Sequence, residues 1–299
     1  MKSIIKKVVS REQAEGQGAR VRRSIGSVGL RNLDPFLMLD EFNVGDTAGF
    51  PDHPHRGFET VTYMMEGVFQ HEDFAGHKGT IGPNDVQWMT AGKGIVHAEM
   101  PLSKGFSKGL QLWVNLPSKF KLVEPDYQEL LAKDIPIASD ASGSIKVTVI
   151  AGSSYGVEAK VHTKTPIYYL DVTMQPNAVF EQDIPADYTA FFYTLSGSVY
   201  FEAMDPNEGD KPAELHSTYV LSPTGTAVRV ATRQEAARFV LLAGEPINEP
   251  IVQHGPFVMN TQQEIRDAIL DYQMGRNGFE KAPEWQSEIA KEFLSKLHL

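Results

Sequence analysis

The histidines of this chain gather in one segment. Five of the nine lie between residues 53 and 97, and two of them form the motif His53-Pro-His55. A second pair of ligand-type residues, His97 and Glu99, follows later in the chain. In a β-strand, residues i and i+2 face the same side, so each pair presents two ligating groups to one side of a sheet. Two such pairs on adjoining strands of a barrel can converge on one ion, which predicts a metal site with three nitrogens and one carboxylate.

The donor types narrow the choice of metal. Imidazole suits Fe, Cu, Ni and Zn, while a carboxylate tolerates Fe and Mn. Structural zinc sites are usually closed and rich in cysteine, and this chain has no cysteine. A mononuclear redox metal with open coordination positions is therefore favoured, and the choice among Fe, Ni, Cu, Mn and Zn stays open.

The alternative is that these histidines cap loops or form hydrogen bonds within the core. That interpretation suits a single histidine better than two ligand pairs at strand spacing. We expect His71 and His77, which flank Glu72 and Asp73, to be loop residues near the mouth of the site rather than ligands.

Short runs rich in β-branched and aromatic residues, separated by Gly, Pro, Asn and Asp, fill the chain as far as about residue 245. This pattern predicts an all-β sandwich or barrel rather than βαβ units. A weak internal repeat, in which residues 63–67 resemble 193–197 and residues 90–92 resemble 223–225, predicts two copies of one β fold. The segment 117–144 mixes charge, Pro and Ser and is typical of an interdomain linker.

The C-terminal region changes from strand patterns to helix patterns. Residues 261–264 form a capping box, which predicts the start of a helix. Two apolar stripes follow at helical spacing, and we expect them to cover sheet faces; a partner-binding helix is the alternative. The stripes consist of Ile265, Ala268, Ile269 and Tyr272, and of Trp285, Ile289, Phe293 and Leu297.

Composition excludes several classes of function. The absence of cysteine rules out disulfides, thiolate zinc, iron–sulfur clusters and a cysteine nucleophile. A net charge of −10 is unfavourable for direct nucleic-acid binding, and no apolar run is long enough for a membrane span or a signal peptide. We therefore expect a cytoplasmic monomer.

The basic cluster Arg20, Arg22 and Arg23 is either a solvated loop or a local docking patch.

Longer motifs carry a resemblance to a known family. The runs PDHPHRGFETVTYMMEG (51–67), NDVQWMTAGKGIVHAEMP (84–101) and GLQLWVNLP (109–117) resemble the pirin family of the cupin superfamily. This resemblance implies an all-β bicupin: two double-stranded β-helix (jelly-roll) barrels packed face to face, with short C-terminal helices. The implied domains are an N-terminal metal-binding cupin domain over residues 1–133 and a C-terminal metal-free cupin domain with a helical tail over residues 134–299.

The resemblance also implies the ligand set. It assigns His53, His55, His97 and Glu99 to the metal, in agreement with the spacing. The wider cupin pattern would instead use Glu59, which we expect to lie behind the ligands. In the second copy, Asp183 and Pro185 occupy the positions equivalent to the two histidines of the H-x-H motif. Arg229 or Val230 occupies the position equivalent to His97.

Two functions follow from the resemblance. The first is a quercetin 2,3-dioxygenase-type enzyme that uses Fe(II)/Fe(III), a planar flavonol-like substrate and O2, with Glu99 as the catalytic base. Trp88, Met64 and Met89 are candidates for its apolar walls or for ordinary core. The second is an iron-dependent redox-sensing co-regulator that binds transcription factors without catalysis, which adds a nuclear location to the cytoplasmic one.

Overall fold

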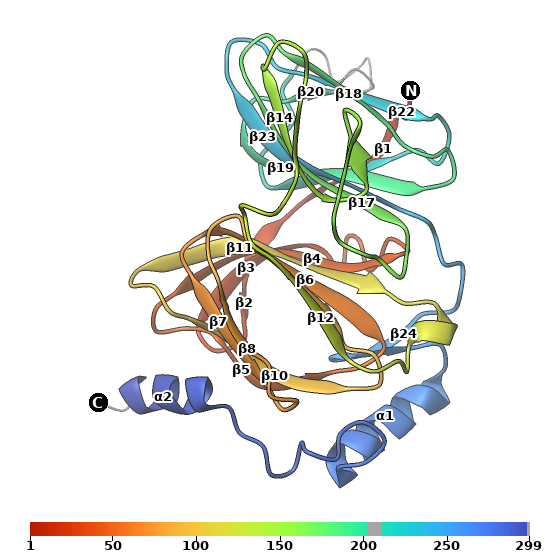
Figure 1. Cartoon of the computed structure of the whole chain (residues 1–299). Coiled ribbons are helices and arrows are strands. Elements are labelled where there is room, and N and C mark those ends of the chain that lie inside the picture. Colours follow the sequence, from red (N-terminus) through yellow and green to blue (C-terminus); the bar gives the residue numbers. More distant parts are fainter. Residues whose placement is uncertain (202–210, 298–299) are drawn as a thin grey trace. The chain divides into compact units, whose positions relative to one another are not determined.

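The structure, a computed structural model, describes residues 1–201 and 211–297, without the side chains of residues 294, 296 and 297. Most of these residues form antiparallel β-strands, and two α-helices lie near the C-terminus (Figure 1). The chain divides into two compact units. Unit 1 comprises residues 1–11, 24–35 and 133–246, and unit 2 comprises residues 12–23, 36–132 and 247–299.

Unit 2 contains the histidine-rich segment and is built from two main sheets. In spatial order, the larger sheet consists of β12 (Asp126–Leu130), β9 (Val86–Thr90), β6 (Phe58–Glu66), β11 (Phe106–Asn115), β4 (Phe36–Gly45), β3 (Ala19–Ile25) and β2 (Arg11–Glu15). The smaller sheet consists of β5 (Phe50–His55), β10 (Ile95–Pro101), β7 (Phe69–Asp73) and β8 (Lys78–Ile81). Figure 1 shows the strands of both sheets surrounding one interior.

Unit 1 repeats this architecture. In spatial order, its larger sheet consists of β1 (Ile4–Val9), β21 (Ser217–Leu221), β19 (Thr189–Gly197), β23 (Ala237–Gly244), β17 (Ile167–Met174), β14 (Ile145–Ala151) and β13 (Ile137–Ser139). Its smaller sheet consists of β18 (Val179–Asp183), β22 (Ala227–Ala231) and β20 (Tyr200–Phe201), and a short hairpin pairs β15 (Ser153–Ser154) with β16 (Val157–Glu158). Over the described residues, the sheets of each unit are separate ladders, so the expected barrels are jelly-roll sandwiches that do not close.

The internal repeat corresponds to equivalent strands. β6 lies between β9 and β11 as β19 lies between β21 and β23, so the two Tyr-x-x-x-Gly runs end equivalent strands. Gly67 and Gly197 both have a positive φ, 77° and 71°. A Cβ would lie 2.4 Å from Ser107 Oγ at the first position and 1.8 Å from the Ala236 carbonyl oxygen at the second. Glycine is therefore required at both turns, and the prediction of two copies of one fold is confirmed.

The segment expected to be a linker is largely structured. It contains a short 3-10 helix, η1 (Ser118–Phe120), followed by β12, which pairs with β9, and β13, which pairs with β14. Each strand thus extends the edge of a larger sheet, and the change from unit 2 to unit 1 falls between residues 132 and 133. Charged and polar residues are normal on edge strands, and this is why the composition looked like that of a linker.

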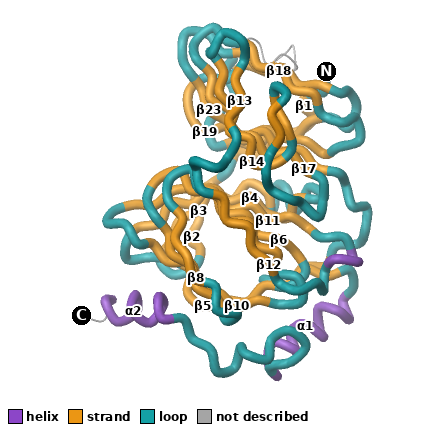
Figure 2. The backbone as a smooth tube through the Cα atoms, in the orientation of Figure 1, coloured by secondary structure: helices purple, strands orange, loops and turns teal. Residues whose placement is uncertain are grey.

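The C-terminal residues from 247 onward, here called the C-terminal tail, belong to unit 2. The tail comprises β24 (Val252–His254), β25 (Phe257–Met259), α1 (Gln262–Met274), a long loop and α2 (Glu288–Leu297) (Figure 2). The predicted C-terminal domain of residues 134–299 includes this tail. In the structure the apolar residues of the tail share a core with Phe74, Met89 and Val96 of unit 2.

The first helix begins as predicted, while α2 begins at Glu288, so Trp285 of the second predicted stripe lies in the loop before it. The Thr261 side chain accepts from the Glu264 amide, and the Glu264 side chain accepts from the Thr261 amide, which is the predicted capping box. Ile265 and Ala268 are buried in the shared core, and Phe293 of α2 is buried as well. The side chain of Leu297 lies outside the described residues. Neither helix of the described chain has the length and apolar character that a bilayer span requires.

Candidate metal centre

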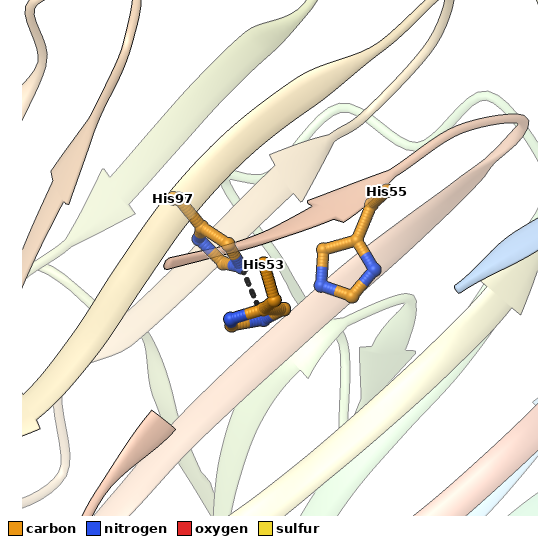
Figure 3. A group of neighbouring side chains, drawn as sticks. All are labelled: His53, His55 and His97. Carbon is orange, nitrogen blue, oxygen red and sulfur yellow. Dashed lines mark hydrogen bonds between the residues drawn. The ribbon is translucent and has the colours of Figure 1, made fainter. Parts of the chain in front are cut away.

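Three imidazoles converge inside unit 2. His53 and His55 lie on β5 and His97 lies on the neighbouring β10, where it is directly opposite His53. Figure 3 shows the three rings turned toward one another. One nitrogen from each ring can be chosen so that all three lie within 4.8 Å of one another. His55 and His97 are buried, while His53 is partly exposed.

The hydrogen bonds of these rings leave nitrogen atoms available for a metal. The Nδ1 atom of His53 lies 2.8 Å from the Pro51 carbonyl oxygen, which can only accept, so Nε2 keeps its lone pair. That Nε2 lies 3.0 Å from Nε2 of His97. Both ring nitrogens of His55 and Nδ1 of His97 are buried without a hydrogen bond of ordinary geometry. Buried polar atoms usually have partners, so a metal ion fits the donors present.

The protonation states also suit a metal. Burial lowers the pKa of His53, and burial together with the neighbouring imidazoles lowers the pKa values of His55 and His97 well below the ordinary histidine value. The rings are therefore neutral at neutral pH. A divalent ion binds neutral imidazole without first displacing a proton.

Glu99 lies beside His97 and is itself buried, but its carboxylate is not part of the group of ligand atoms that the three histidines form. Its Oε1 accepts a hydrogen bond of 3.0 Å from Thr62 Oγ1, and its Oε2 lies 3.9 Å from His97 Nε2. Burial raises the pKa of Glu99 to about 7, against the opposing effect of the Thr62 hydrogen bond. A carboxyl group with this pKa exchanges a proton readily near neutral pH, as a general base must.

The wall next to Glu99 is polar. Gln111 Oε1 lies 2.7 Å from the same Thr62 hydroxyl. A hydroxyl donates a single hydrogen, so both contacts can form together when the Gln111 amide turns its NH2 group toward Thr62. This arrangement gives a chain of hydrogen bonds from Gln111 through Thr62 to Glu99.

The other carboxylate considered from sequence lies elsewhere. Glu59 is three residues from Thr62 on β6 and therefore faces the opposite side of the sheet. It accepts a hydrogen bond of 2.7 Å from Thr90. Trp88, which is opposite Val61 in the register, also lies on that far side. Two of the three residues considered as site walls, Met64 and Met89, are instead in apolar core clusters.

Sequence reasoning missed the aromatic residues at the site. Phe58 and Trp113 pack edge-on against His55, with ring centroids at 5.2 and 5.3 Å. A signal for Trp113 exists in the sequence. Strand alternation places it on the face opposite the buried residues Leu110 and Leu112.

His71 is not a loop residue, contrary to expectation. It is buried on β7 directly opposite Glu99, and its Nε2 lies 2.6 Å from Glu129 Oε1. Two flanking acidic residues suggested a loop, but Glu72 and Asp73 are buried with hydrogen-bond partners. His77 does lie in the turn after β7, where its Nδ1 is 2.8 Å from Asp73 Oδ2.

The equivalent strand pair in unit 1 carries different side chains. β18 and β22 correspond to β5 and β10, and their buried positions hold Phe180, Gln182, Val228 and Val230. Asp183 is at the exposed end of β18, and Arg229 forms a surface ion pair of 3.1 Å with Glu181. None of these four side chains is a histidine: three are apolar and the fourth is the amide of Gln182.

The basic cluster near the N-terminus is neutralised within unit 2. Arg23 forms two hydrogen bonds with the buried Asp40, at 2.9 and 2.7 Å, and one with Glu15. Arg20 and Arg22 both pair with Glu12, at 3.0 and 3.9 Å. The cluster therefore lies on β3 within a charge network, in which the Arg20–Glu12 pair is exposed.

Comparisons with known proteins agree with this architecture. A family model described as Pirin matches residues 18–114, and one described as Pirin C-terminal cupin domain matches residues 169–278. A pirin-like protein of Solanum lycopersicum is 56% identical over 286 residues, covering 95% of this chain and 96% of its own. Pirin of Homo sapiens is 53% identical over 290 residues, covering 96% and 98%.

Two solved structures are similar to this chain in fold. A crystal structure of quercetin 2,3-dioxygenase from Acinetobacter baumannii is 33% identical, with a TM-score of 0.85 over 93% of this chain and 99% of its own. A bacterial pirin from Escherichia coli in complex with nickel(II) shares the fold, with a TM-score of 0.63 at 17% identity over 79% of this chain and 96% of its own. The three histidines support a metal cofactor.

Proposed function

This chain belongs to the pirin family, with two cupin domains, and from this we propose that it is a metal-dependent dioxygenase of the quercetin 2,3-dioxygenase type. The observation that carries the proposal is the buried convergence of His53, His55 and His97 beside Glu99. The similarity to a quercetin 2,3-dioxygenase structure over nearly the whole chain supports the same activity.

We assign the four residues as follows. His53 would bind through Nε2, because its Nδ1 donates to the Pro51 carbonyl. His97 would bind through Nε2, which faces the same point, and His55 and Glu99 would complete the set. Iron is the proposed metal, with nickel, copper, manganese and zinc as alternatives. When bound, the metal would supply Lewis acidity and one-electron chemistry toward O2.

The protein residues would then hold the substrate and move its proton. A flavonol would enter on the side of the partly exposed His53 and place its ring near Phe58 and Trp113. Glu99 would accept the proton of the flavonol hydroxyl at Oε2, while Thr62 keeps Oε1 in place. The pKa of Glu99 is about 7 without metal, and a bound cation would favour its ionised form, which can accept this proton.

Oxygen consumption tests the proposal. Protein loaded separately with Fe(II), Ni(II), Cu(II), Mn(II) or Zn(II) is mixed with quercetin, and uptake of O2 is followed with an electrode. At least one metal form should turn over faster than the same free ion, and the His97→Ala variant treated identically should not. Equal rates for loaded protein and free ion, for every metal, would refute the enzymatic proposal.

A further inference from the structure

The strand that carries two of the histidines has a sheet neighbour on one side only. β5 is the outermost strand of its sheet, where it pairs with β10. The C-terminal tail contacts this strand at both ends of its histidine pair. Asp52 precedes His53 and Arg56 follows His55, and alternation along a strand turns these two away from the face that the histidines use.

The first contact is a buried ion pair. Nη1 of Arg56 donates to Asp271 Oδ2 at 2.9 Å, and both side chains are less than a tenth exposed. The same guanidinium donates to the backbone carbonyls of Lys93 and Asn277, at 2.6 and 2.5 Å, and lies over the ring of Phe279. Three of these partners belong to the tail, so α1 and the loop after it fix the arginine that follows His55.

The second contact holds the start of α2. The carboxylate of Asp52 accepts from the backbone amide of Ser287 at 3.1 Å and from its hydroxyl. Glu72 of β7 accepts from the amides of Glu288 and Ile289, at 2.9 and 3.3 Å. Amides at a helix start lack partners within the helix, so carboxylates satisfy them well.

The third contact is made by the backbone. The Arg56 amide donates to the Pro256 carbonyl at 3.2 Å, and the Val258 amide donates to the Arg56 carbonyl at 3.0 Å. The buried Lys121 ammonium donates to the carbonyls of Gly57 and Val258, at 2.9 and 3.1 Å. The tail thus provides the hydrogen-bonding neighbour that the end of β5 otherwise lacks.

We propose that the C-terminal tail is a clamp that positions the metal centre, with Arg56, Asp271, Asp52 and Ser287 as positioning residues. This inference rests on the proposed metal site. Ligands must be held within about 0.5 Å of their working geometry. His97 lies in the interior of its sheet between two strands, but His53 and His55 lie on an edge strand and depend on the tail.

The clamp has a consequence that follows from thermodynamic linkage. If docking of the tail raises the affinity for metal, then bound metal stabilises docking of the tail by the same factor. Metal binding should therefore slow hydrogen exchange at the amides of α1 and α2, although these helices contribute none of the proposed ligands.

The Asp271→Asn variant tests the clamp. It keeps the shape of the side chain and removes the charge that faces Arg56. Asp171→Asn is the control, because the buried Asp171 forms an ion pair with the partly exposed Arg238 in unit 1, at 3.0 and 2.6 Å. Ni(II) affinity is measured by competition with a chromogenic chelator, and amide exchange is measured by mass spectrometry on metal-free and Ni(II)-loaded protein.

For Asp271→Asn we expect the dissociation constant for Ni(II) to rise by about tenfold or more, as for other residues that support ligands. Exchange at residues 53–57 should also become faster in the metal-free protein, while residues 95–99 change less. The Asp171→Asn control should bind Ni(II) like the wild type. Equal affinities in the two variants, or unchanged exchange at residues 53–57, would overturn the clamp.

Two further outcomes separate the clamp from the proposed metal site. If wild-type protein binds no metal, the proposed site fails, and the exchange at residues 53–57 in the metal-free variants still decides the clamp. If Asp271→Asn does not fold, Ser287→Ala replaces it, because this change removes the hydroxyl that contacts Asp52 and leaves the ion pair intact. Unchanged exchange and affinity in Ser287→Ala would then overturn the proposal.

Discussion

Replacing Glu99 by glutamine should stabilise the metal-free protein and weaken its metal site. Glutamine keeps the shape of the side chain and can still accept the hydrogen bond from Thr62, but it carries no charge. The pKa of Glu99 is raised from 4.5 to about 7 because the carboxyl group is buried. Each pKa unit corresponds to about 1.4 kcal/mol, so the ionised carboxylate destabilises the folded state by about 3 kcal/mol.

The sign of the pH dependence follows from the raised pKa. Below pH 4.5 the carboxyl is protonated in both the folded and the unfolded chain, so Glu99 carries no penalty. Between pH 4.5 and 7 the unfolded chain releases its proton first, and the free energy of unfolding falls as pH rises. The Glu99→Gln variant escapes this loss. Its advantage over the wild type should be below about 1 kcal/mol at pH 5 and reach about 3 kcal/mol at pH 8.

Urea unfolding of metal-free protein, followed by tryptophan fluorescence, measures this difference. The three tryptophans, Trp88, Trp113 and Trp285, all belong to unit 2, so the signal reports the unit that contains Glu99. Ni(II) at a hundred times its dissociation constant should then stabilise the wild type by about 2.7 kcal/mol and the variant by less. An equal difference at both pH values, or a variant that is less stable at pH 8 without metal, would refute the reasoning.

Four further outcomes are expected. His97→Ala should lose most bound metal by elemental analysis, because it removes the ring opposite His53; full occupancy would contradict the ligand set. Metal affinity, measured by calorimetry, should rise with pH up to about 7 and then level off, because the metal competes with the proton on Glu99; a flat profile would contradict this competition. Gly57→Ala should reduce the stability of unit 2 by about 1–3 kcal/mol or more, because φ is +88° and a Cβ would lie 2.0 Å from the Val258 carbonyl oxygen; an unchanged urea midpoint would be inconsistent. Trp113→Leu should lower kcat/KM for quercetin with metal content unchanged, and equal turnover would remove this residue from the substrate site.

The histidine centre could be predicted because its signal is local. Strand periodicity places His53 and His55 on one face of β5, and the same rule places His97 and Glu99 together on β10. Spacing alone therefore predicts both ligand pairs, while the antiparallel pairing that places His97 opposite His53 is seen only in the structure.

The contacts between the C-terminal tail and the strand that carries His53 and His55 could not be predicted in the same way. Arg56 is adjacent to His55, but its partner Asp271 is 215 residues away, and no local pattern links a buried arginine to a distant helix. Likewise, nothing near Asp52 in the sequence indicates that its carboxylate accepts hydrogen bonds from Ser287. The packing of the tail against unit 2 could not be predicted either, because helical periodicity shows which face of a helix is apolar and not which sheet that face covers.

X-ray absorption spectroscopy of the metal-loaded protein tests whether the three histidines bind the metal. With one Fe(II) or Ni(II) per chain, we expect nitrogen and oxygen atoms around the metal, with the outer-shell scattering of three imidazole rings, from His53, His55 and His97. In the His97→Ala variant loaded at high metal concentration, one imidazole contribution should disappear. A wild-type spectrum without imidazole scattering, or one unchanged by His97→Ala, would rule out this ligand set.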